Sequence, residues 1–345
     1  MRTFTGEPFG IGERPDLIAG EQAARAAQSR LHDLINVTPL IQSRSLNALA
    51  GRSLWFKAEN LQRTGSYKPR GSFNSLLVAR ERGEITAGGV VVDSSGNFGQ
   101  AIAFGARELQ VEATVFMPAD SNEMKARACA AAGATVVREG ITWQNRGSSA
   151  RDYAEEHDLL YLPADAWEGM AGDGTLSLEL LDQNHDFDTV VAPLSSGGLL
   201  AGMAIVLKSL RPDIRVVGVQ PAASGHALRS LQSGRICTLD EAPRTIADGA
   251  RTLALGERPF AILQSCLDSV VLVDDEWTLR ATWLLMTRTK MVVEPTGALA
   301  FAAVLAGKVA SDRVVCLISG GNADLADLGT RFRAAGFVAS DGAGN

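Results

Sequence analysis

Short valine-rich runs alternate with helical segments along most of the chain. The runs are residues 89–92, 113–117, 134–137, 189–192, 216–219, 270–273 and 314–318. Segments with helical spacing lie between most of them, at residues 99–109, 122–132, 148–157, 176–181, 199–210, 276–287 and 297–305. Strands that are apolar throughout indicate a parallel sheet covered on both faces, because both sides of each strand are then buried. The pattern therefore predicts an α/β fold.

The length of 345 residues suggests two domains, because one small core would not accommodate it. A change of composition at PADAWEGMAG separates two series of strands and helices. We expect a small domain at residues 88–163, inserted into a large domain made of residues 1–87 and 164–345. At the N-terminus, residues 1–20 predict a weakly ordered arm, and residues 21–35 predict a helix capped by Asn36.

Charge and cysteine content exclude several classes of protein. The net charge is −6, and the charges of both signs are scattered, so the chain has no basic surface for nucleic acid or for membranes. No run approaches the length of a membrane span, and the N-terminus lacks the apolar core of a signal peptide. The four cysteines are far apart, which indicates neither a disulfide framework nor a zinc site. We expect a cytoplasmic protein.

Lys68 lies between an extended run, residues 53–59, and a helical segment that begins near Gly71. Gly65 and Pro69 mark a turn at this junction. A rigid scaffold can aim such a lysine into a cleft, and a lysine amine forms Schiff bases with carbonyl compounds, pyridoxal phosphate included. Considered alone, Lys68 is more simply interpreted as a solvated surface lysine, since most lysines are exposed.

A serine-rich turn follows the run at 89–92 and opens the next helical segment. It consists of Ser94, Ser95, Gly96 and Asn97. Backbone amides and the helix dipole favour an anion such as a carboxylate here, and Ser95 and Asn97 add hydrogen bonds that orient it. A plain helix cap followed by a glycine turn explains the same residues equally well.

A second turn follows the run at 189–192 and contains Ser195, Ser196, Gly197 and Gly198. Consecutive amides without bulky side chains form a concave cradle for phosphate. The turn matches neither the dinucleotide-binding motif nor the P-loop, so a small phosphate ester is a better fit than a nucleotide. A glycine turn without a ligand is the alternative.

Two further strand ends carry polar residues. Glu294 either caps the helix that follows it or borders a cleft. Ser319 follows the last strong strand, where a hydroxyl can hydrogen-bond a ring nitrogen without forcing its protonation; a turn-forming serine is the alternative. Ligands of open parallel sheets bind outside the carboxyl ends of strands, so these turns and Lys68 predict one common site.

In these segments the chain resembles the threonine dehydratase and serine racemase family of pyridoxal-phosphate enzymes, which has the tryptophan synthase β-like fold (fold type II). KAENLQRTGSYKPRGS resembles the family's Schiff-base segment, SSGNFGQA its substrate-carboxylate loop, SSGGL its phosphate loop, and SGGN its pyridine-nitrogen segment. VGVQP, TIADG and TKMVVEPTGA also match in order and approximate spacing. The resemblance covers residues 38–329.

The resemblance implies two domains, each an open, mostly parallel sheet flanked by helices, and pyridoxal 5'-phosphate as cofactor. It implies that Lys68 holds the cofactor aldehyde and, once the substrate releases it, acts as a base at the substrate Cα. Ser95 would reach the opposite face of the cofactor ring, and Asn97 would contact the ring hydroxyl. The remaining implied contacts are the substrate carboxylate with Ser94, Ser95, Gly96, Asn97 and Gln100, the phosphate with Ser195, Ser196, Gly197 and Gly198, and the ring nitrogen with Ser319.

The sequence departs from the family's pattern near the expected pocket. Tyr67 and Pro69 stand where phenylalanines are common, and Phe98 replaces a frequent histidine. These changes suggest a substrate other than threonine, such as hydroxyaspartate or a phenylserine. Gln220 stands where the family's cation site often begins with a glutamate. Because hard cations prefer charged oxygen ligands, we expect no metal there.

The reaction that the resemblance favours is β-elimination of a β-hydroxy amino acid to a keto acid and ammonia, that of a dehydratase or ammonia-lyase. Proton return from the face of Ser95 would instead make the protein an amino-acid racemase, and entry of a second nucleophile would make it a β-replacement synthase. A non-catalytic binding protein with the same fold is an alternative of another class. The family also suggests a homodimer.

Overall fold

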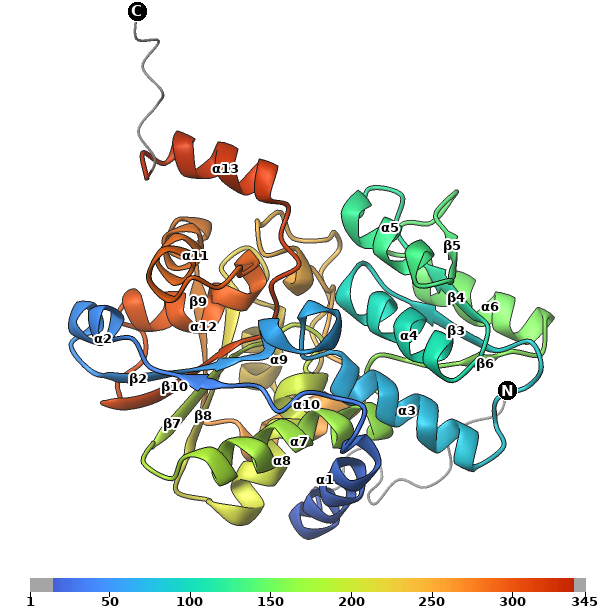
Figure 1. Ribbon diagram of the computed structural model, residues 1–345, viewed down its shortest axis with the longest axis horizontal. Helices are drawn as coiled ribbons and strands as arrows, with labels where there is room; N and C mark the ends of the chain where they lie inside the picture. Colours follow the sequence, from blue (N-terminus) through green and yellow to red (C-terminus); the bar gives the residue numbers. More distant parts are fainter. Residues whose placement is uncertain (1–14, 338–345) are drawn as a thin grey trace, which may run out of the picture.

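The computed structural model describes residues 15–337, and its strands form two sheets (Figure 1). In spatial order, the six-stranded sheet consists of β1 (Leu40–Ile41), β2 (Ser53–Ala58), β10 (Arg313–Ile318), β7 (Thr189–Pro193), β8 (Arg215–Pro221) and β9 (Ser269–Val273). β1 pairs antiparallel with β2, and each of the other neighbouring pairs is parallel. The prediction of mostly parallel sheets is therefore confirmed.

The four-stranded sheet is parallel throughout and consists, in spatial order, of β5 (Thr135–Val137), β4 (Ala113–Phe116), β3 (Val90–Asp93) and β6 (Leu160–Tyr161). In Figure 1 it lies to the right of the six-stranded sheet, together with α4 (Asn97–Glu108), α5 (Glu123–Ala131) and α6 (Arg146–Glu156). Its four strands lie between residues 90 and 161. The bounds 88–163 of a small domain remain a prediction.

The other helices accompany the six-stranded sheet. They are α1 (Leu17–Leu31), α2 (Arg44–Ala50), α3 (Pro69–Glu81), α7 (Trp167–Gln183), α8 (Gly198–Leu210), α9 (His226–Ser233), α10 (Glu257–Cys266), α11 (Asp275–Thr289), α12 (Pro295–Leu305) and α13 (Leu325–Ala334). Short 3-10 helices lie at η1 (Glu59–Leu61), η2 (Arg63–Gly65) and η3 (Asp248–Ala250). Helix α3 packs against both α7 and α4, so it joins the regions of the two sheets.

Hydrophobic cores lie on both faces of the six-stranded sheet. In β7, Val190 and Ala192 pack in the core formed with α7 and α8, whereas Val191 packs in the core formed with α12. Burying one such side chain contributes roughly 1.5–3 kcal/mol. In β3, β7, β8 and β10 the apolar runs are continuous because successive residues are buried on opposite faces, as the sequence pattern predicts, whereas the edge strands β5 and β9 are mostly only partly buried.

The N-terminal helix differs from its prediction. Helix α1 begins at Leu17 because the carboxylate of Asp16 accepts hydrogen bonds from two amides of its first turn, and it ends at Leu31. The predicted cap at Asn36 is therefore wrong, and residues 17–20 belong to the helix rather than to an arm. Residues 1–14 of the predicted arm lie outside the described residues. Among the described residues, no helix combines the length and the apolar character that crossing a bilayer requires.

Candidate active site

The predicted site segments come together at the carboxyl ends of the parallel strands. In the six-stranded sheet, β10 lies between β2 and β7, and Ile318 pairs with Ala58. The segments that follow β2, β10 and β7 therefore leave the same edge of the sheet, and they carry Lys68, Ser319 and Ser195. The register of the sheet thus explains how residues that are far apart in sequence line one cavity.

The segment before Lys68 is attached to the segment that follows β10. The amide of Tyr67 donates to the carbonyl of Ser319 (3.1 Å), and the amide of Gly321 donates to the carbonyl of Gly65 (2.8 Å). Gly65 has a φ of +73°, and a Cβ at this position would lie 2.5 Å from Oδ1 of Asn322, so the close approach requires glycine. These contacts fix the backbone on the N-terminal side of Lys68.

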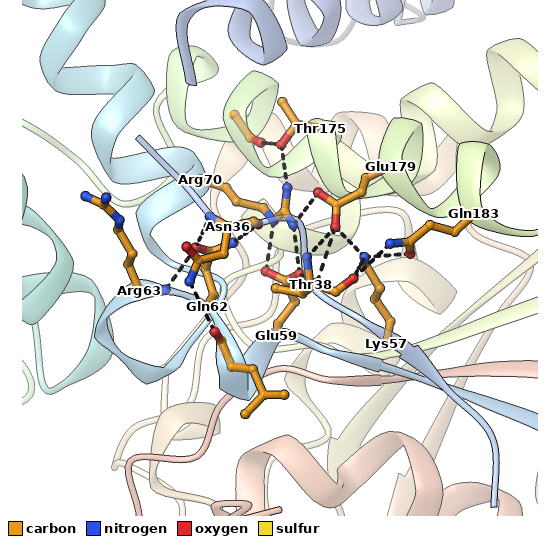
Figure 2. Close-up of polar contacts among 12 residues, drawn as sticks. Asn36, Thr38, Lys57, Glu59, Gln62, Arg63, Arg70, Thr175, Glu179 and Gln183 are labelled. Carbon is orange, nitrogen blue, oxygen red and sulfur yellow. Dashed lines mark hydrogen bonds and ion pairs between the residues drawn. The ribbon is translucent and has the colours of Figure 1, made fainter. Parts of the chain in front are cut away.

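A buried ion network, which we call the Arg70 network, fixes the C-terminal side (Figure 2). The guanidinium of Arg70 donates two hydrogen bonds to Glu59 (2.8 and 2.9 Å) and one to Glu179 (2.8 Å). Glu179 also pairs with Lys57, and the hydroxyl of Thr38 donates to Glu59. Arg70 is two residues beyond Lys68 in the first turn of α3, where Pro69 is favourable as the first helical residue. The network therefore anchors the start of the helix that carries Lys68.

The cavity has a volume of about 880 Å³, its open mouth included. Most of the predicted site residues line it, namely Lys68, Ser94, Ser95, Gly96, Asn97, Ser195, Ser196, Gly197, Gly198 and Ser319. Gln100 does not line it; its side-chain oxygen Oε1 accepts a hydrogen bond from the side-chain amide of Asn322 (3.2 Å). Glu294 lines the cavity and its side chain makes no capping hydrogen bond. It therefore borders a cleft, which is the second of the two interpretations of this residue.

The serine-rich turn that follows β3 contains a helix cap. The hydroxyl of Ser94 accepts hydrogen bonds from the amides of Gly96 (3.2 Å) and Gly99 (2.8 Å) at the start of α4. The Ser94 side chain is thus engaged in capping, while Ser95 and Asn97 face the cavity. The cap is therefore confirmed for Ser94, and carboxylate binding by Ser95 and Asn97 stays a prediction.

The turn that follows β7 has the form of a phosphate cradle. Gly197 has a φ of +99° and precedes the first residue of α8, whose leading amides lack partners within the helix. A Cβ at Gly197 would lie 2.7 Å from Pro259, so no side chain fits there. The hydroxyl of Ser195 is hydrogen-bonded to that of Thr252 (2.9 Å). A narrow turn at a helix start in the same cavity as a primary amine fits pyridoxal phosphate, which has both an aldehyde and a phosphate.

A second charged group, which we call the Lys125 cluster, lies at the wall of the cavity. Lys125 donates to Asp248 (2.8 Å) and to Glu294 (2.9 Å), and the amide of Asn97 donates to the other oxygen of Glu294 (2.6 Å). Lys125 belongs to α5 beside the four-stranded sheet, whereas Asp248 and Glu294 belong to the region of the six-stranded sheet. The cluster therefore links the two regions across the cavity.

The charges around Lys68 raise its pKa. Burial lowers the pKa of this amine, but its interactions with the Tyr67 phenol and the carboxylates of Asp173 and Asp165 outweigh that effect. Burial raises the pKa of the Tyr67 phenol, which is hydrogen-bonded to Lys68. The nitrogen of Lys68 lies 4.8 Å from the centre of the Tyr67 ring and 5.3 Å from that of Phe98. The substitutions noted in the sequence therefore contact the lysine itself.

Arg146 brings a positive charge to the cavity wall. Its Nε lies 3.2 Å from the carboxylate of Asp93, which also accepts a hydrogen bond from the Tyr161 hydroxyl (2.5 Å). The guanidinium lies 5.2 Å from the centre of the Trp143 ring. Asp93 and Tyr161 hold Arg146 in place, and the paired guanidinium keeps donors available for an anion.

Gln220 hydrogen-bonds with neighbouring protein groups. Its side-chain oxygen accepts hydrogen bonds from the backbone amides of Ala227 (3.0 Å) and Leu228 (3.3 Å), and its side-chain nitrogen lies 3.1 Å from Nε2 of His226. Burial lowers the pKa of His226 to about 4, so the imidazole is neutral at pH 7. Among the described residues, no group of three or more His, Cys, Asp or Glu side chains is arranged to hold a metal ion.

Sequence reasoning missed several cavity residues, namely Asp93, Lys125, Arg146, Asp248, Thr252 and Thr296. Asp93 ends β3, directly before the serine-rich turn, so its position at a strand end was a usable signal. Lys125 and Arg146 lie on helices with no distinctive spacing or motif. Their role depends on the packing of the two sheets, which no local pattern encodes.

Comparisons with known proteins agree with this geometry. Residues 31–320 match the family described as "Pyridoxal-phosphate dependent enzyme". L-threo-3-hydroxyaspartate ammonia-lyase of Saccharomyces cerevisiae is 39% identical over 302 residues, 87% of this chain and 92% of that protein. Serine racemase of Dictyostelium discoideum is 37% identical over 310 residues, 88% of this chain and 95% of that protein. The crystal structure of a threonine deaminase from T.th. has a TM-score of 0.83 at 44% identity, covering 88% of this chain and 98% of that one.

Proposed function

The chain belongs to the family of pyridoxal-phosphate dependent enzymes, and we propose that it is an ammonia-lyase acting by β-elimination on a β-hydroxy amino acid. The products are a keto acid and ammonia. The observation that carries the proposal is that a lysine amine and two serine-containing turns at helix starts line one cavity. This combination supplies an anchor for an aldehyde, one for a phosphate and one for a carboxylate.

Each residue of the site has a proposed task. Bound pyridoxal phosphate supplies the electron withdrawal that makes the substrate Cα proton acidic. Lys68 would hold the cofactor aldehyde and, with its amine free, would accept that proton. The amides of residues 195–198 would hold the phosphate, Ser319 would contact the ring nitrogen, and Asn97 would contact the ring hydroxyl. The turn at residues 94–97, with Gln100 behind it, orients the substrate carboxylate.

A 3-hydroxyaspartate is the substrate that Arg146 favours. Such a substrate has a second carboxylate, and Arg146 presents a guanidinium to the cavity. A guanidinium binds a carboxylate through two parallel hydrogen bonds, whereas threonine offers only a methyl group at this end. The similarity to L-threo-3-hydroxyaspartate ammonia-lyase supports the same substrate. A phenylserine is less favoured, since its ring offers no carboxylate to the guanidinium.

A panel of β-hydroxy amino acids tests this proposal. The purified protein is incubated with threo-3-hydroxyaspartate, threonine, serine and phenylserine, and keto acid and ammonia are measured. We expect the highest kcat/KM for 3-hydroxyaspartate and a loss of at least tenfold for that substrate in Arg146→Gln, with little change for serine. Arg151→Gln, which removes a charge from the same helix outside the cavity, serves as the control. Activity with threonine alone would contradict the proposed substrate.

The Lys68→Ala variant separates an enzyme from a non-catalytic protein of the same fold. The wild-type protein should show the visible absorbance of a cofactor bound through an amine, and the variant should lose both this absorbance and product formation. A colourless wild-type protein that forms no product would favour the binding protein.

Racemisation is a second candidate, because Ser95 lines the cavity and a serine racemase is 37% identical. Ser95 would return a proton to the face opposite Lys68. Chiral analysis of the amino acid that remains after partial reaction distinguishes the two outcomes. Inversion that is lost in Ser95→Ala would support the racemase.

Four further proposals concern the domains, the assembly and the location of the protein; of these, the homodimer rests on the family resemblance. We propose a small domain at residues 88–163 that carries the substrate loop, a large cofactor-binding domain formed by 1–87 and 164–345, a homodimer, and a cytoplasmic location. We also propose that activity needs no bound cation, since the Gln220 side chain is hydrogen-bonded by protein groups. Light scattering gives the oligomeric state, and activity in the presence of a chelator tests the cation.

A further inference from the structure

Asp173 is a buried carboxylic acid to which the proposed reaction gives no task. It lies on α7 and is 5% exposed, and its Oδ1 has no hydrogen-bond partner among the described residues. Buried polar groups without partners are rare and costly, so such a group often serves a purpose other than stability. Asp173 does not line the cavity. It therefore acts from behind the cavity wall.

Close packing of glycines brings Asp173 to the start of α3. A Cβ at Gly71 would lie 2.7 Å from the carbonyl oxygen of Gly169 and 2.9 Å from Oδ1 of Asp173. A Cβ at Gly172 would lie 2.2 Å from the carbonyl oxygen of Arg70. Helices α3 and α7 therefore meet backbone to backbone at the turn that follows Lys68. The Asp173 carboxylate occupies the positive end of α3, next to the backbone of Gly71.

The groups that interact electrostatically with Asp173 are Lys68, Arg70, Glu59 and Tyr67. Burial raises the pKa of Asp173 to about 7, while the positive charges of Lys68 and Arg70 oppose that shift. Arg70 is already paired with Glu59 and Glu179. A change in the charge of Asp173 therefore shifts the pKa of Lys68 more than that of Arg70.

We propose that Asp173 is a positioning residue for Lys68, whose negative charge, held behind the cavity wall, makes the Lys68 amine a stronger base for the Cα proton. This inference rests on the proposed function, because it assigns the base to Lys68. When Asp173 is ionised, the ammonium form of Lys68 is stabilised. When Asp173 takes up a proton at lower pH, that support is lost and the amine becomes a weaker base.

The sign of the pH dependence follows from this arrangement. As the pH falls through about 7, Asp173 becomes neutral and kcat should fall with it. In Asp173→Asn the support is absent at every pH. The ratio of wild-type to variant kcat should therefore be at least fivefold at pH 8.5 and should approach one at pH 5.5. A ratio that stays constant over this range would show a merely structural role and would overturn the proposal.

Two further variants complete the test. Glu168→Gln removes another buried carboxylate from α7, one that pairs with Arg82, and should keep the wild-type pH profile. Tyr67→Phe removes the phenol beside Lys68 but leaves Asp173, so the fall of kcat near pH 7 should remain. Loss of this fall in Tyr67→Phe, together with its persistence in Asp173→Asn, would assign it to Tyr67 and overturn the proposal.

A spectroscopic measurement does not depend on turnover. In the cofactor-bound protein without substrate, the pH at which the cofactor absorbance changes reports the proton on the nitrogen of Lys68. We expect this midpoint to lie about one unit lower in Asp173→Asn, since an opposite charge nearby stabilises the protonated form. An unchanged midpoint would overturn the inference. A shifted midpoint in a protein that forms no keto acid would support Asp173 while contradicting the proposed function.

If Asp173→Asn does not fold, the wild-type protein still decides the question. The midpoint of the kcat profile near pH 7 is measured at two temperatures. Ionisation of a carboxyl group changes little with temperature, whereas that of an amine moves to lower pH on heating. A midpoint that moves with heating would assign the profile to an amine and overturn the role of Asp173.

Discussion

The Arg70 network and the Lys125 cluster are both built from buried ion pairs, but they differ in what surrounds them. Arg70 and Glu59 are almost completely buried, and the hydrogen bonds of the network run to other protein groups (Figure 2). Lys125 and Glu294 are equally buried, but their partner Asp248 is 33% exposed and the cluster borders the cavity. The first group holds one region together, whereas the second joins two regions across a space for ligands.

The balance of charge differs in the same way. In the Arg70 network, two cations, Arg70 and Lys57, meet two carboxylates, Glu59 and Glu179. In the Lys125 cluster, a single ammonium is shared by Glu294 and Asp248. Balanced and fully hydrogen-bonded charge specifies one rigid arrangement, whereas a shared cation leaves one carboxylate that responds to a ligand or a proton. The Arg70 network therefore holds the helix that carries Lys68 in a rigid position, whereas the Lys125 cluster at the cavity wall can respond to a ligand.

The largest effect should come from Arg70→Leu. Removing this cation leaves Glu59 and Glu179 buried without their partner, and breaking such a pair costs about 3–5 kcal/mol. We expect that loss in the free energy of unfolding measured with urea, accompanied by weaker cofactor binding. The double variant Arg70→Leu with Glu59→Leu should be more stable than Arg70→Leu alone. Equal stability of the single and double variants would contradict an ion network whose members depend on one another.

A smaller loss of stability with a larger loss of activity should follow from Lys125→Met. Asp248 can turn towards water in the cavity, so we expect a cost of about 1–3 kcal/mol. The repelling carboxylates should separate and displace Asn97, which is bonded to Glu294, and kcat/KM should fall at least tenfold. Arg127→Met on the exposed side of α5 is the matched control. If Lys125→Met lowered the stability but left kcat/KM unchanged, the cluster would be a structural element like the Arg70 network.

The sequence predicts the valine-rich strands of this fold well, but not its two-residue strands or the full length of α7. Each predicted valine-rich run is a strand, because burial on two faces leaves a clear local signal. Strands β1 and β6 contain two residues each and are stabilised by their neighbours, so no periodicity reveals them. Helix α7 extends from Trp167 to Gln183, well beyond its predicted core at 176–181. Its first turns contain glycines that pack against α3, and tertiary contact outweighs their low helix propensity.

The residues around the candidate site also fall into two groups, those that a local sequence pattern predicts and those that only tertiary packing brings there. Lys68, Ser195 and Ser319 follow strands and were found because turns at strand ends carry polar sequence. Lys125 and Asp173 were not found, because each lies within a helix whose local sequence gives no sign of its partners. Lys125 meets Glu294 across 169 positions in the sequence. Local pattern therefore identifies the residues that a strand end presents, but not the charges that packing adds around them.

The pH dependence of stability should have opposite signs in the two groups. Burial raises the pKa of Glu179, but Arg70 and Lys57 outweigh it and leave the pKa lowered, so its stabilisation is complete above the unfolded-state pKa and is lost as the pH falls. Burial, with the charge of Asp248, raises the pKa of Glu294 despite Lys125, so ionising it costs stability as the pH rises. Relative to wild type, Glu179→Gln should therefore recover at low pH and Glu294→Gln at high pH. Urea unfolding between pH 3 and 8 tests this, and parallel curves would contradict it.

The smallest effect should come from an ion pair whose cation is exposed to water. Arg25 pairs with Glu21 one turn away on α1, and its side chain is 55% exposed. Water and salt screen such a pair, so Arg25→Leu should change the free energy of unfolding by about 0.3–0.5 kcal/mol, an effect that 1 M salt should abolish. The same salt should leave the cost of Arg70→Leu nearly unchanged, because the Arg70 network is closed to ions. A common salt dependence in both variants would mean that water reaches Arg70, and the contrast between a sealed network and a cavity-facing cluster would then be wrong.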